Sequence, residues 1–419
     1  MGEINLQDFN VDELRGVTDS SGKLRGFLQP GESVASWGRV PLYYGVVASR
    51  CAPPSVQAGA GNNTLQGASR HVAFEGMDEI QVCYANKRLS SGVGEVNAGA
   101  SATYACDVEY PAGTVTTITF GAATTGTVED GGFLRSDKTK LKARIPRGAT
   151  FMMSHYQACA AGVIYHGGTG LNNVTGSVPL SRETFVYGAA VANLVGTGNK
   201  PNNQNASVCF KPTLILGWTT RPSFAIAGDS KQDNAVLHDT VGDLLGLVGE
   251  SQRIIGASYA HVNLAMTGEA LSEALGRYTL RQVLASYCSN VISNYGRNDL
   301  SNGRTAAQIM ADISTFRVLL GKPFAQHTIT PVSTSTDAWA TTVNQTTAVN
   351  NAARITLNDS LRFGASGIDY LVEVADSVET ARNSGIWKAG YTADGTHQLQ
   401  VAFKSIEADQ SARFRALIG

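Results

Sequence analysis

The sequence predicts a two-part fold, with a β-rich domain over residues 1–221 and an α/β domain over residues 222–419. The first part is rich in Gly, Ala, Thr and Asn, and its apolar residues come in short runs between turn-like clusters. From Pro222 on, short apolar runs alternate with segments of helical length. Many short strands with glycine-rich turns indicate a β-sandwich or jelly roll. Alternating strands and helices indicate a parallel sheet covered by helices on both faces, a three-layer α/β/α domain.

The expected strands of the first part are apolar segments that turn residues bound on either side. They cover residues 71–75, 78–84, 115–120, 149–156 and 208–218.

The second part is expected to begin with the strand Phe224-Ala225-Ile226-Ala227. Further strands are expected within 254–264 and over 291–295, 324–331 and 368–374, and helices over 236–248, 271–286, 305–320, 348–363 and the tail after Gln398. Ligands of such sheets bind beyond the carboxyl ends of the strands. Residues that directly follow a strand are therefore the candidates for a site.

Composition excludes several classes of function. With 43% hydrophobic and 16% charged residues, the chain is typical of a globular protein. The net charge of −1 and the lack of a basic stripe argue against nucleic acid or an anionic membrane as partner. No apolar run is long enough to insert in a bilayer, and no signal peptide is visible, although a secreted or virion-associated protein stays open.

The motifs of metal and cofactor chemistry are missing. None of the six cysteines forms a Cys-x-x-Cys pair, and no His-Glu-x-x-His, P-loop or dinucleotide fingerprint occurs, so we expect neither metal nor organic cofactor. We expect the cysteines to be small buried hydrophobes, with one disulfide in the first half left open for an exported protein. The Gly-x-Ser-x-Gly turn of α/β-hydrolases is also missing.

Four short blocks in the second half carry the chemistry. They are Gly228-Asp229-Ser230, Asn263-Leu264-Ala265-Met266-Thr267-Gly268, Gly296-Arg297-Asn298-Asp299 and Asp394-Gly395-Thr396-His397. A serine hydroxyl becomes a nucleophile when an imidazole takes its proton, and a carboxylate holds that imidazole in the useful tautomer. The first and third blocks each follow an expected strand. Together the blocks supply the groups that acyl transfer requires.

In this order the blocks resemble the SGNH (GDSL) hydrolase family over about half the chain, from Pro222 to the C-terminus. The resemblance implies a flavodoxin-like sheet, with Ser230 as nucleophile, His397 as base and Asp394 as the group that orients it. It also implies an oxyanion hole made by the backbone amides of Ser230 and Gly268 and the side-chain amide of Asn298. Three such donors would stabilise the tetrahedral intermediate.

The chain departs from the family pattern at two positions. Lys231 stands where many relatives carry leucine, and no proline follows His397. Both leave subfamily and substrate open. We expect Asp229 to hold the turn rather than to take part in catalysis.

Other histidines and two tryptophans lie in the second half. We expect His238, His261 and His327 to be structural or surface residues. Trp339 and Trp387 are expected on loops, either as substrate-facing platforms or as packing residues.

These features predict a serine esterase that removes short acyl groups, acetyl first, from carbohydrate. A lipase or arylesterase of the same family, or a phage-tail or surface glycan-binding protein with a deacetylase domain, stays open. Its partner would be an acylated small molecule or polysaccharide, and a homo-oligomer is possible. Residues 136–151 resemble part of the β-sandwich modules that precede some SGNH carbohydrate esterases. Such a module could bind glycan, shape a wall of the active-site cleft or drive oligomerisation, and a purely structural role that covers a sheet edge also stays open.

Overall fold

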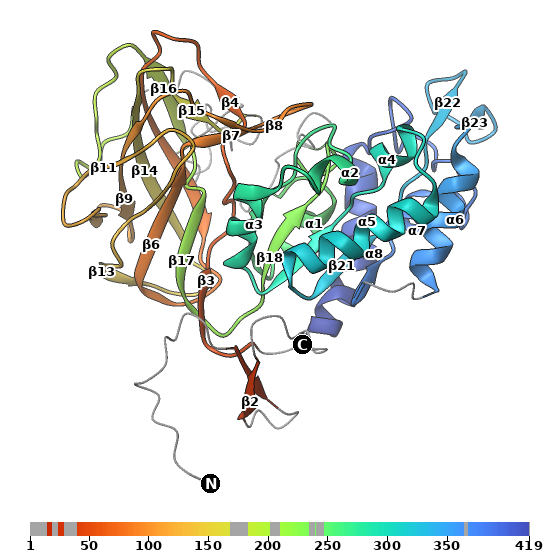
Figure 1. Cartoon of the computed structure of the whole chain (residues 1–419), viewed down its shortest axis with the longest axis horizontal. Helices are drawn as coiled ribbons and strands as arrows, with labels where there is room; N and C mark the ends of the chain where they lie inside the picture. Colours follow the sequence, from red (N-terminus) through yellow and green to blue (C-terminus); the bar gives the residue numbers. More distant parts are fainter. Residues whose placement is uncertain are drawn as a thin grey trace.

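The computed structural model describes residues 15–18, 24–28, 40–167, 183–201, 210–233, 239, 247–363 and 368–418. Antiparallel strands make up the first half, and a parallel sheet covered by helices makes up the second (Figure 1). The two halves lie side by side along the long axis of the molecule. Among the described residues, no helix is both long and apolar enough to cross a membrane.

Two antiparallel sheets dominate the first half. The six-stranded sheet contains β10 (Val115–Thr117), β9 (Ala102–Glu109), β14 (Thr150–Cys159), β5 (Thr64–Val72) and β16 (Thr184–Gly188), with β11 (Gly126–Val128) paired to β9. The five-stranded sheet contains β12 (Phe133–Arg135), β6 (Met77–Ala85), β17 (Leu214–Thr219) and β3 (Tyr43–Val46), with β13 (Thr139–Ile145) paired to β6. Three two-stranded ribbons accompany them: β1 (Arg15–Thr18) with β2 (Leu24–Leu28), β4 (Val56–Gln57) with β15 (Ile164–Tyr165), and β7 (Lys87–Ser90) with β8 (Gly94–Asn97).

Aromatic side chains join these two sheets. Tyr84 on β6 stacks against Tyr104 on β9, with ring centroids 4.7 Å apart and an interplanar angle of 7°. Both rings are buried, as is Phe210, which stacks on Tyr84 with ring centroids 5.8 Å apart. The many short strands expected in the first half are present. Assignment to the β-sandwich or jelly-roll class stays a prediction.

The parallel sheet of the second half has five strands. In spatial order they are β19 (Ala260–Asn263), β18 (Ser223–Ala227), β20 (Asn290–Ser293), β21 (Phe324–His327) and β24 (Tyr370–Val372), all parallel to their neighbours. Numbered along the chain, this order is 2-1-3-4-5, the order of flavodoxin-like sheets. The short ribbon of β22 (Ser333–Ser335) and β23 (Gln345–Thr347) follows β21.

Helices cover both faces of this sheet because successive strand residues point to opposite faces. Phe224 and Ile226 belong to one buried cluster with Phe403 and Phe414, and Ala225 belongs to another. The first face packs against α1 (Glu250–Ile255), α7 (Ala375–Val378) and α8 (Gln400–Ile418). The second is covered by α2 (Leu271–Ala274), α3 (Thr279–Ser286), α4 (Arg297–Ser301), α5 (Ala306–Leu320) and α6 (Asn351–Arg362) (Figure 1). The second half is thus a three-layer α/β/α unit.

The strand expected within 254–264 is confirmed, and one expected helix needs correction. The strand is Ala260–Asn263, whereas Ile254 and Ile255 end α1 and are buried against α8. A short apolar run does not distinguish a buried strand from a buried helix turn. The expected helix 271–286 is broken into α2 and α3 around Gly276. The expected helix 236–248 lies almost wholly outside the described residues, as does the start of the expected strand 208–218.

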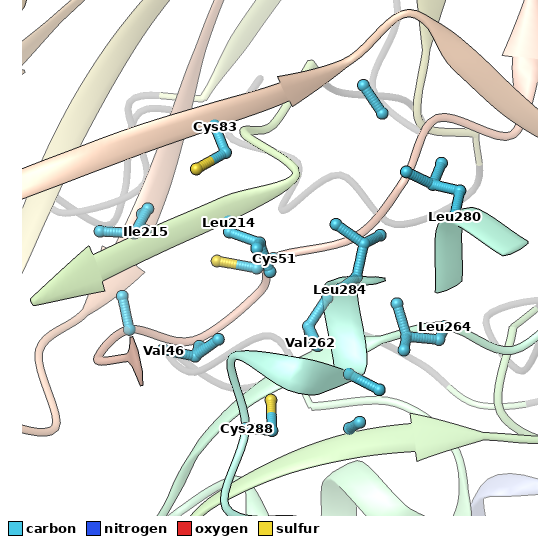
Figure 2. Packing of buried hydrophobic residues seen from close by; sticks show 14 of the residues in the cluster. Val46, Cys51, Cys83, Leu214, Ile215, Val262, Leu264, Leu280, Leu284 and Cys288 are labelled. Atoms are coloured by element: carbon cyan, nitrogen blue, oxygen red, sulfur yellow. The ribbon is translucent and has the colours of Figure 1, made fainter. Parts of the chain in front are cut away.

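A single buried cluster joins the two halves. Figure 2 shows Val46, Cys51, Leu214 and Ile215 of the first half beside Val262, Leu280, Leu284 and Cys288 of the second. Cys51 also pairs with Val262 through an isolated parallel bridge. The change from antiparallel to parallel sheet falls between β17 and β18, near the expected boundary, but the core is continuous across it.

The cysteines serve this packing. Cys51, Cys83, Cys106, Cys159 and Cys288 are free and buried, and Cys209 lies outside the described residues. For these five residues the interpretation as small buried hydrophobes is confirmed.

Candidate active site

Three of the sequence-predicted residues form one chain of hydrogen bonds. Ser230 lies just beyond the carboxyl end of β18, and Asp394 and His397 lie in the loop that precedes α8. The Ser230 Oγ is 2.9 Å from His397 Nε2, and His397 Nδ1 is 2.7 Å from Asp394 Oδ2. If Nδ1 carries the proton toward the carboxylate, Nε2 presents its lone pair to the serine hydroxyl. This geometry allows His397 to take the hydroxyl proton.

Asp394 is held in its ionised form. Burial raises the pKa of its carboxyl, but hydrogen bonds from the His397 amide and ring and from the Thr396 amide lower it to about 2. The two amides donate to Oδ1 at 2.7 and 2.8 Å, while Oδ2 faces the imidazole. A permanent negative charge therefore lies beside the His397 ring at neutral pH. It would stabilise an imidazolium that formed there.

The turn that presents Ser230 is clasped by Asn294 from the end of β20. The side chain of Asn294 accepts from the Asp229 amide and donates to Asp229 Oδ1, both at 3.1 Å. Gly228, at φ 153°, lies so close that a Cβ there would be 1.8 Å from Asn294 Oδ1. Asp229 is buried and also accepts from the Lys231 amide. These contacts agree with the structural role expected for Asp229.

The second block lies beside the turn that carries Ser230. Met266 donates its amide to the Gly228 carbonyl at 2.9 Å, and Thr267 donates its amide and hydroxyl to Asp233, three residues beyond Ser230. Gly268 follows at φ 78°, a conformation that favours glycine. The loop therefore runs along the same edge of the sheet as Ser230.

Asn298 of the third block joins this loop. Its Nδ2 donates to the Glu269 carbonyl at 3.0 Å, which uses one of the two amide protons. Its neighbour Asp299 is buried and accepts from the Leu271 and Ser272 amides at the start of α2. Gly268 thus lies on the loop that follows β19, and Asn298 lies in the first turn of α4, which follows β20; β19 and β20 are the strands on either side of β18.

A network of buried polar side chains lies next to these loops. Gln398 donates to Glu250 Oε1 at 2.5 Å, and Glu250 Oε2 is 2.8 Å from His327 Nδ1. Lys231 is buried as well and donates to the Thr330 hydroxyl. Burial lowers the pKa of Lys231, and the carboxylates of Glu250 and Asp229 oppose that shift. The contact between Gln398 and Glu250 anchors the residue next to His397.

Two hydrogen bonds from other segments hold the turn between Asp394 and His397. The Gly395 carbonyl accepts from the Ser333 amide and from Trp387 Nε1, each at 3.1 Å. Trp387 is fully buried, so the option that it faces substrate is wrong. Trp339 is partly buried, and its indole donates to the Ser333 hydroxyl at 3.0 Å. Of the two tryptophans, only Trp339 keeps an exposed portion.

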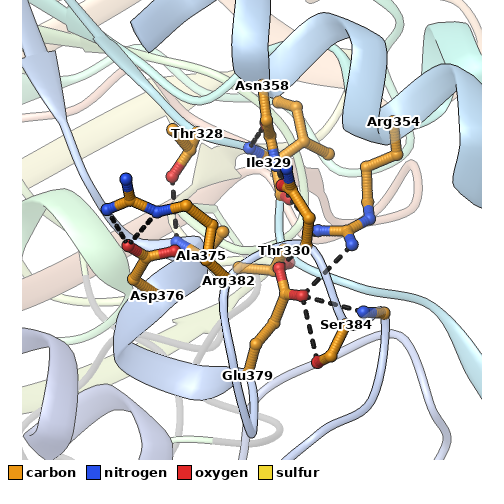
Figure 3. A network of polar contacts seen from close by, with 12 residues as sticks. Thr328, Ile329, Thr330, Arg354, Asn358, Ala375, Asp376, Glu379, Arg382 and Ser384 are labelled. Carbon is orange, nitrogen blue, oxygen red and sulfur yellow. Dashed lines mark hydrogen bonds and ion pairs between the residues drawn. The ribbon is translucent and has the colours of Figure 1, made fainter.

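A second polar network fixes the segment behind this turn (Figure 3). Arg354 donates to Glu379 and to the Ile329 carbonyl, and Asn358 exchanges hydrogen bonds with both backbone groups of Ile329. Arg354 and Glu379 have no exposed side-chain surface. This network fixes the segment that continues to Thr330, the partner of Lys231.

The remaining histidines of the second half lie apart from the triad. His261 is buried on β19, and burial lowers its pKa to about 4. His327 is buried on β21, and His238 lies outside the described residues. Sequence reasoning missed Glu250, Asn294 and Arg354. Only Asn294 carried a signal, since it lies near the end of the expected strand 291–295, two residues before Gly296.

No protein-family model and no curated protein matches this chain. Solved structures do. A GDSL-like lipase from Bacteroides thetaiotaomicron is similar at 15% identity and a TM-score of 0.35, over 47% of this chain and 89% of that one. A variant of an acetyl-xylooligosaccharide esterase from Geobacillus is similar at 14% identity and a TM-score of 0.32, over 47% and 94%. A member of the lipolytic G-D-S-L family from Veillonella parvula is similar at 11% identity and a TM-score of 0.33, over 46% and 99%. These neighbours are GDSL hydrolases and esterases.

Proposed function

We propose that this protein is a serine esterase that hydrolyses short-chain acyl esters, acetyl esters first, on carbohydrate. The observation that carries the proposal is the chain of hydrogen bonds from Ser230 through His397 to Asp394. Each of these residues comes from one of the four blocks that resemble the SGNH hydrolases. At His397 Nε2, the mechanism requires only the contact with Ser230 Oγ.

The reaction would proceed in two halves. Ser230 Oγ attacks the ester carbonyl while His397 Nε2 takes its proton. The tetrahedral oxyanion is stabilised by the backbone amides of Ser230 and Gly268 and by the free amide proton of Asn298. The intermediate collapses when His397 returns the proton to the leaving alcohol. A water molecule, deprotonated by the same imidazole, then releases the acid and restores Ser230.

The exposure of the site favours a hydrophilic ester. The His397 side chain is 25% exposed and that of Asp394 is 43% exposed. A long apolar acyl chain gains binding energy of about 0.8 kcal/mol for each buried CH₂, which requires an enclosed apolar wall. A short acyl group on a sugar suits this exposed setting, and a lipase or arylesterase is the competing reading.

Turnover of p-nitrophenyl esters of increasing chain length tests the proposal. We expect the wild type to hydrolyse the acetyl ester fastest and to lose rate as the chain grows. Ser230→Ala should remove turnover by about 10⁶, as in a comparable triad. Ser101→Ala, which changes an exposed serine of the first half, is the matched control and should keep full activity. A rate that rises with chain length would favour the lipase reading, and undiminished turnover by Ser230→Ala would refute the esterase.

Acetylated oligosaccharides test the alcohol part of the substrate. We expect serine-dependent release of acetate from them, at a kcat/KM above that for p-nitrophenyl acetate. If acetylated sugars are not hydrolysed while simple aryl acetates are, the carbohydrate assignment is wrong and the esterase assignment stands.

A further inference from the structure

We propose that Ser91, in the β-rich first half, is a positioning residue for the oxyanion hole. The inference rests on the proposed function and assigns the first half a part in it. Ser91 lies at the turn of the hairpin formed by β7 and β8. Its hydroxyl donates to the carbonyl oxygen of Thr267 at 2.7 Å. This contact joins residues 176 positions apart in the sequence.

The Ser91 hydroxyl donates to the peptide unit whose N–H, that of Gly268, is the proposed oxyanion donor. The Thr267 carbonyl and the Gly268 amide belong to one planar peptide, in which C=O and N–H point in opposite directions. A donor held on the carbonyl therefore fixes the direction of the Gly268 N–H. It also polarises the peptide and makes that N–H a stronger donor. Ser91 thus acts on the proposed oxyanion through the rigid peptide between Thr267 and Gly268.

The close packing of Ser91 against Gly268 supports this positioning role. A Cβ at Gly268 would be 3.3 Å from the Ser91 hydroxyl, so the turn of the hairpin lies directly against the glycine. The opposite side of Thr267 is held by Asp233, which accepts from the Thr267 amide at 2.9 Å. Thr267, the residue before Gly268, is consequently held from both halves of the molecule.

The same hairpin also holds the residue after Gly268. Glu95 on β8 accepts from the Leu280 and Arg281 amides at the start of α3, at 2.7 and 3.0 Å, and from Arg281 Nε at 3.2 Å. Arg281 in turn donates to both carboxylate oxygens of Glu269, at 2.5 and 2.9 Å. Arg281 and Glu269 are fully buried. Because Asn298 donates to the Glu269 carbonyl, this relay supports the other oxyanion donor as well.

Oxyanion stabilisation depends on donors that are fixed before the charge develops. Removal of a whole donor typically costs ~10²–10³ in turnover. Removal of Ser91 would leave the Gly268 N–H present but less well directed and less polarised. We therefore expect a smaller loss, concentrated in kcat because the oxyanion forms only in the transition state.

The test compares Ser91→Ala with Ser91→Thr and Ser101→Ala on p-nitrophenyl acetate. We expect Ser91→Ala to lower kcat about tenfold with KM within about twofold. Ser91 is exposed, so the thermal midpoint should stay that of the wild type. Ser91→Thr keeps a hydroxyl and should restore most of the rate, while Ser101→Ala should change nothing. An unchanged kcat in Ser91→Ala, or a loss that appears only in KM, overturns the proposal.

A boronic acid that forms a tetrahedral adduct with a serine gives a second readout. Its oxygen occupies the oxyanion position, so its inhibition constant should rise in Ser91→Ala by the factor by which kcat/KM falls. An unchanged inhibition constant contradicts the positioning role. The two proposals fail separately: a Ser230→Ala enzyme with full turnover refutes the esterase, whereas a normal Ser91→Ala beside an inactive Ser230→Ala refutes only the role of Ser91.

Discussion

The indole of Trp387 donates to the carbonyl oxygen of Gly395 at 3.1 Å, behind the turn that carries Asp394 and His397. Trp387 has no exposed surface, and its own amide donates to Gln345 Oε1 at 3.0 Å. The base of the proposed reaction is therefore positioned by a buried tryptophan that cannot contact substrate.

We predict that Trp387→Phe impairs catalysis through this turn. Phenylalanine fills most of the volume but cannot donate, so the Gly395 carbonyl loses one of its two hydrogen bonds, which costs about 0.5–1.5 kcal/mol. The Ser333 amide still holds Gly395, so we expect a lower midpoint of urea unfolding and a several-fold lower kcat, not loss of the fold. Trp218→Phe, on β17 of the first half, is the control. Equal effects of the two substitutions on kcat would contradict the prediction.

Gly228→Ala should abolish activity. The new Cβ would lie 1.8 Å from Asn294 Oδ1, a distance that forces the turn carrying Ser230 to move. Gly59→Ala is the matched control, since a Cβ there meets nothing within 4 Å. We expect the control to keep wild-type turnover of p-nitrophenyl acetate. Substantial turnover by Gly228→Ala would show that the clasp by Asn294 is not needed.

The four blocks made the proximity of Ser230, His397 and Asp394 predictable because each block is a local pattern and each lies at the end of a strand or beside a helix. Ser230, His397 and Asp394 are brought together as expected. The support for them was not predictable: Ser91, Glu250 and Trp387 act through contacts between distant segments and belong to no motif. The helical conformation of Ile254 was not predictable either, since burial against α8 rather than local periodicity decides it.

Asp394 should make stability depend on pH in the acid range. Its pKa is about 2 in the folded protein and near ~3.9 in an unfolded chain. A carboxyl with a lower pKa in the folded state stabilises the fold above the unfolded value, and this contribution is lost as pH falls through the folded value. The difference in unfolding free energy between wild type and Asp394→Asn should therefore shrink from pH 4 toward pH 2. Urea titrations across that window measure it, and a constant difference would contradict the assignment.

The shared core predicts that the second half does not fold alone. Leu284 is fully buried in the cluster that joins the halves, whereas Val283 on the same helix is 46% exposed. We expect Leu284→Ala to lower the free energy of unfolding by about 2–5 kcal/mol. Val283→Ala should change it by less than about 0.5 kcal/mol. A fragment of residues 207–419 should be insoluble or unfolded, and a soluble fragment with full esterase activity would refute both the shared core and the role of Ser91.

The most direct test of the central claim is to map the residue that a fluorophosphonate modifies. Such a reagent phosphonylates a serine whose proton a neighbouring base removes, so the proposed site should react once, at Ser230. We expect peptide mass spectrometry to place a single adduct on the peptide that contains Ser230. His397→Ala should react far more slowly, and Ser230→Ala should not react. An adduct on another serine, or unchanged labelling of Ser230→Ala, would contradict the account.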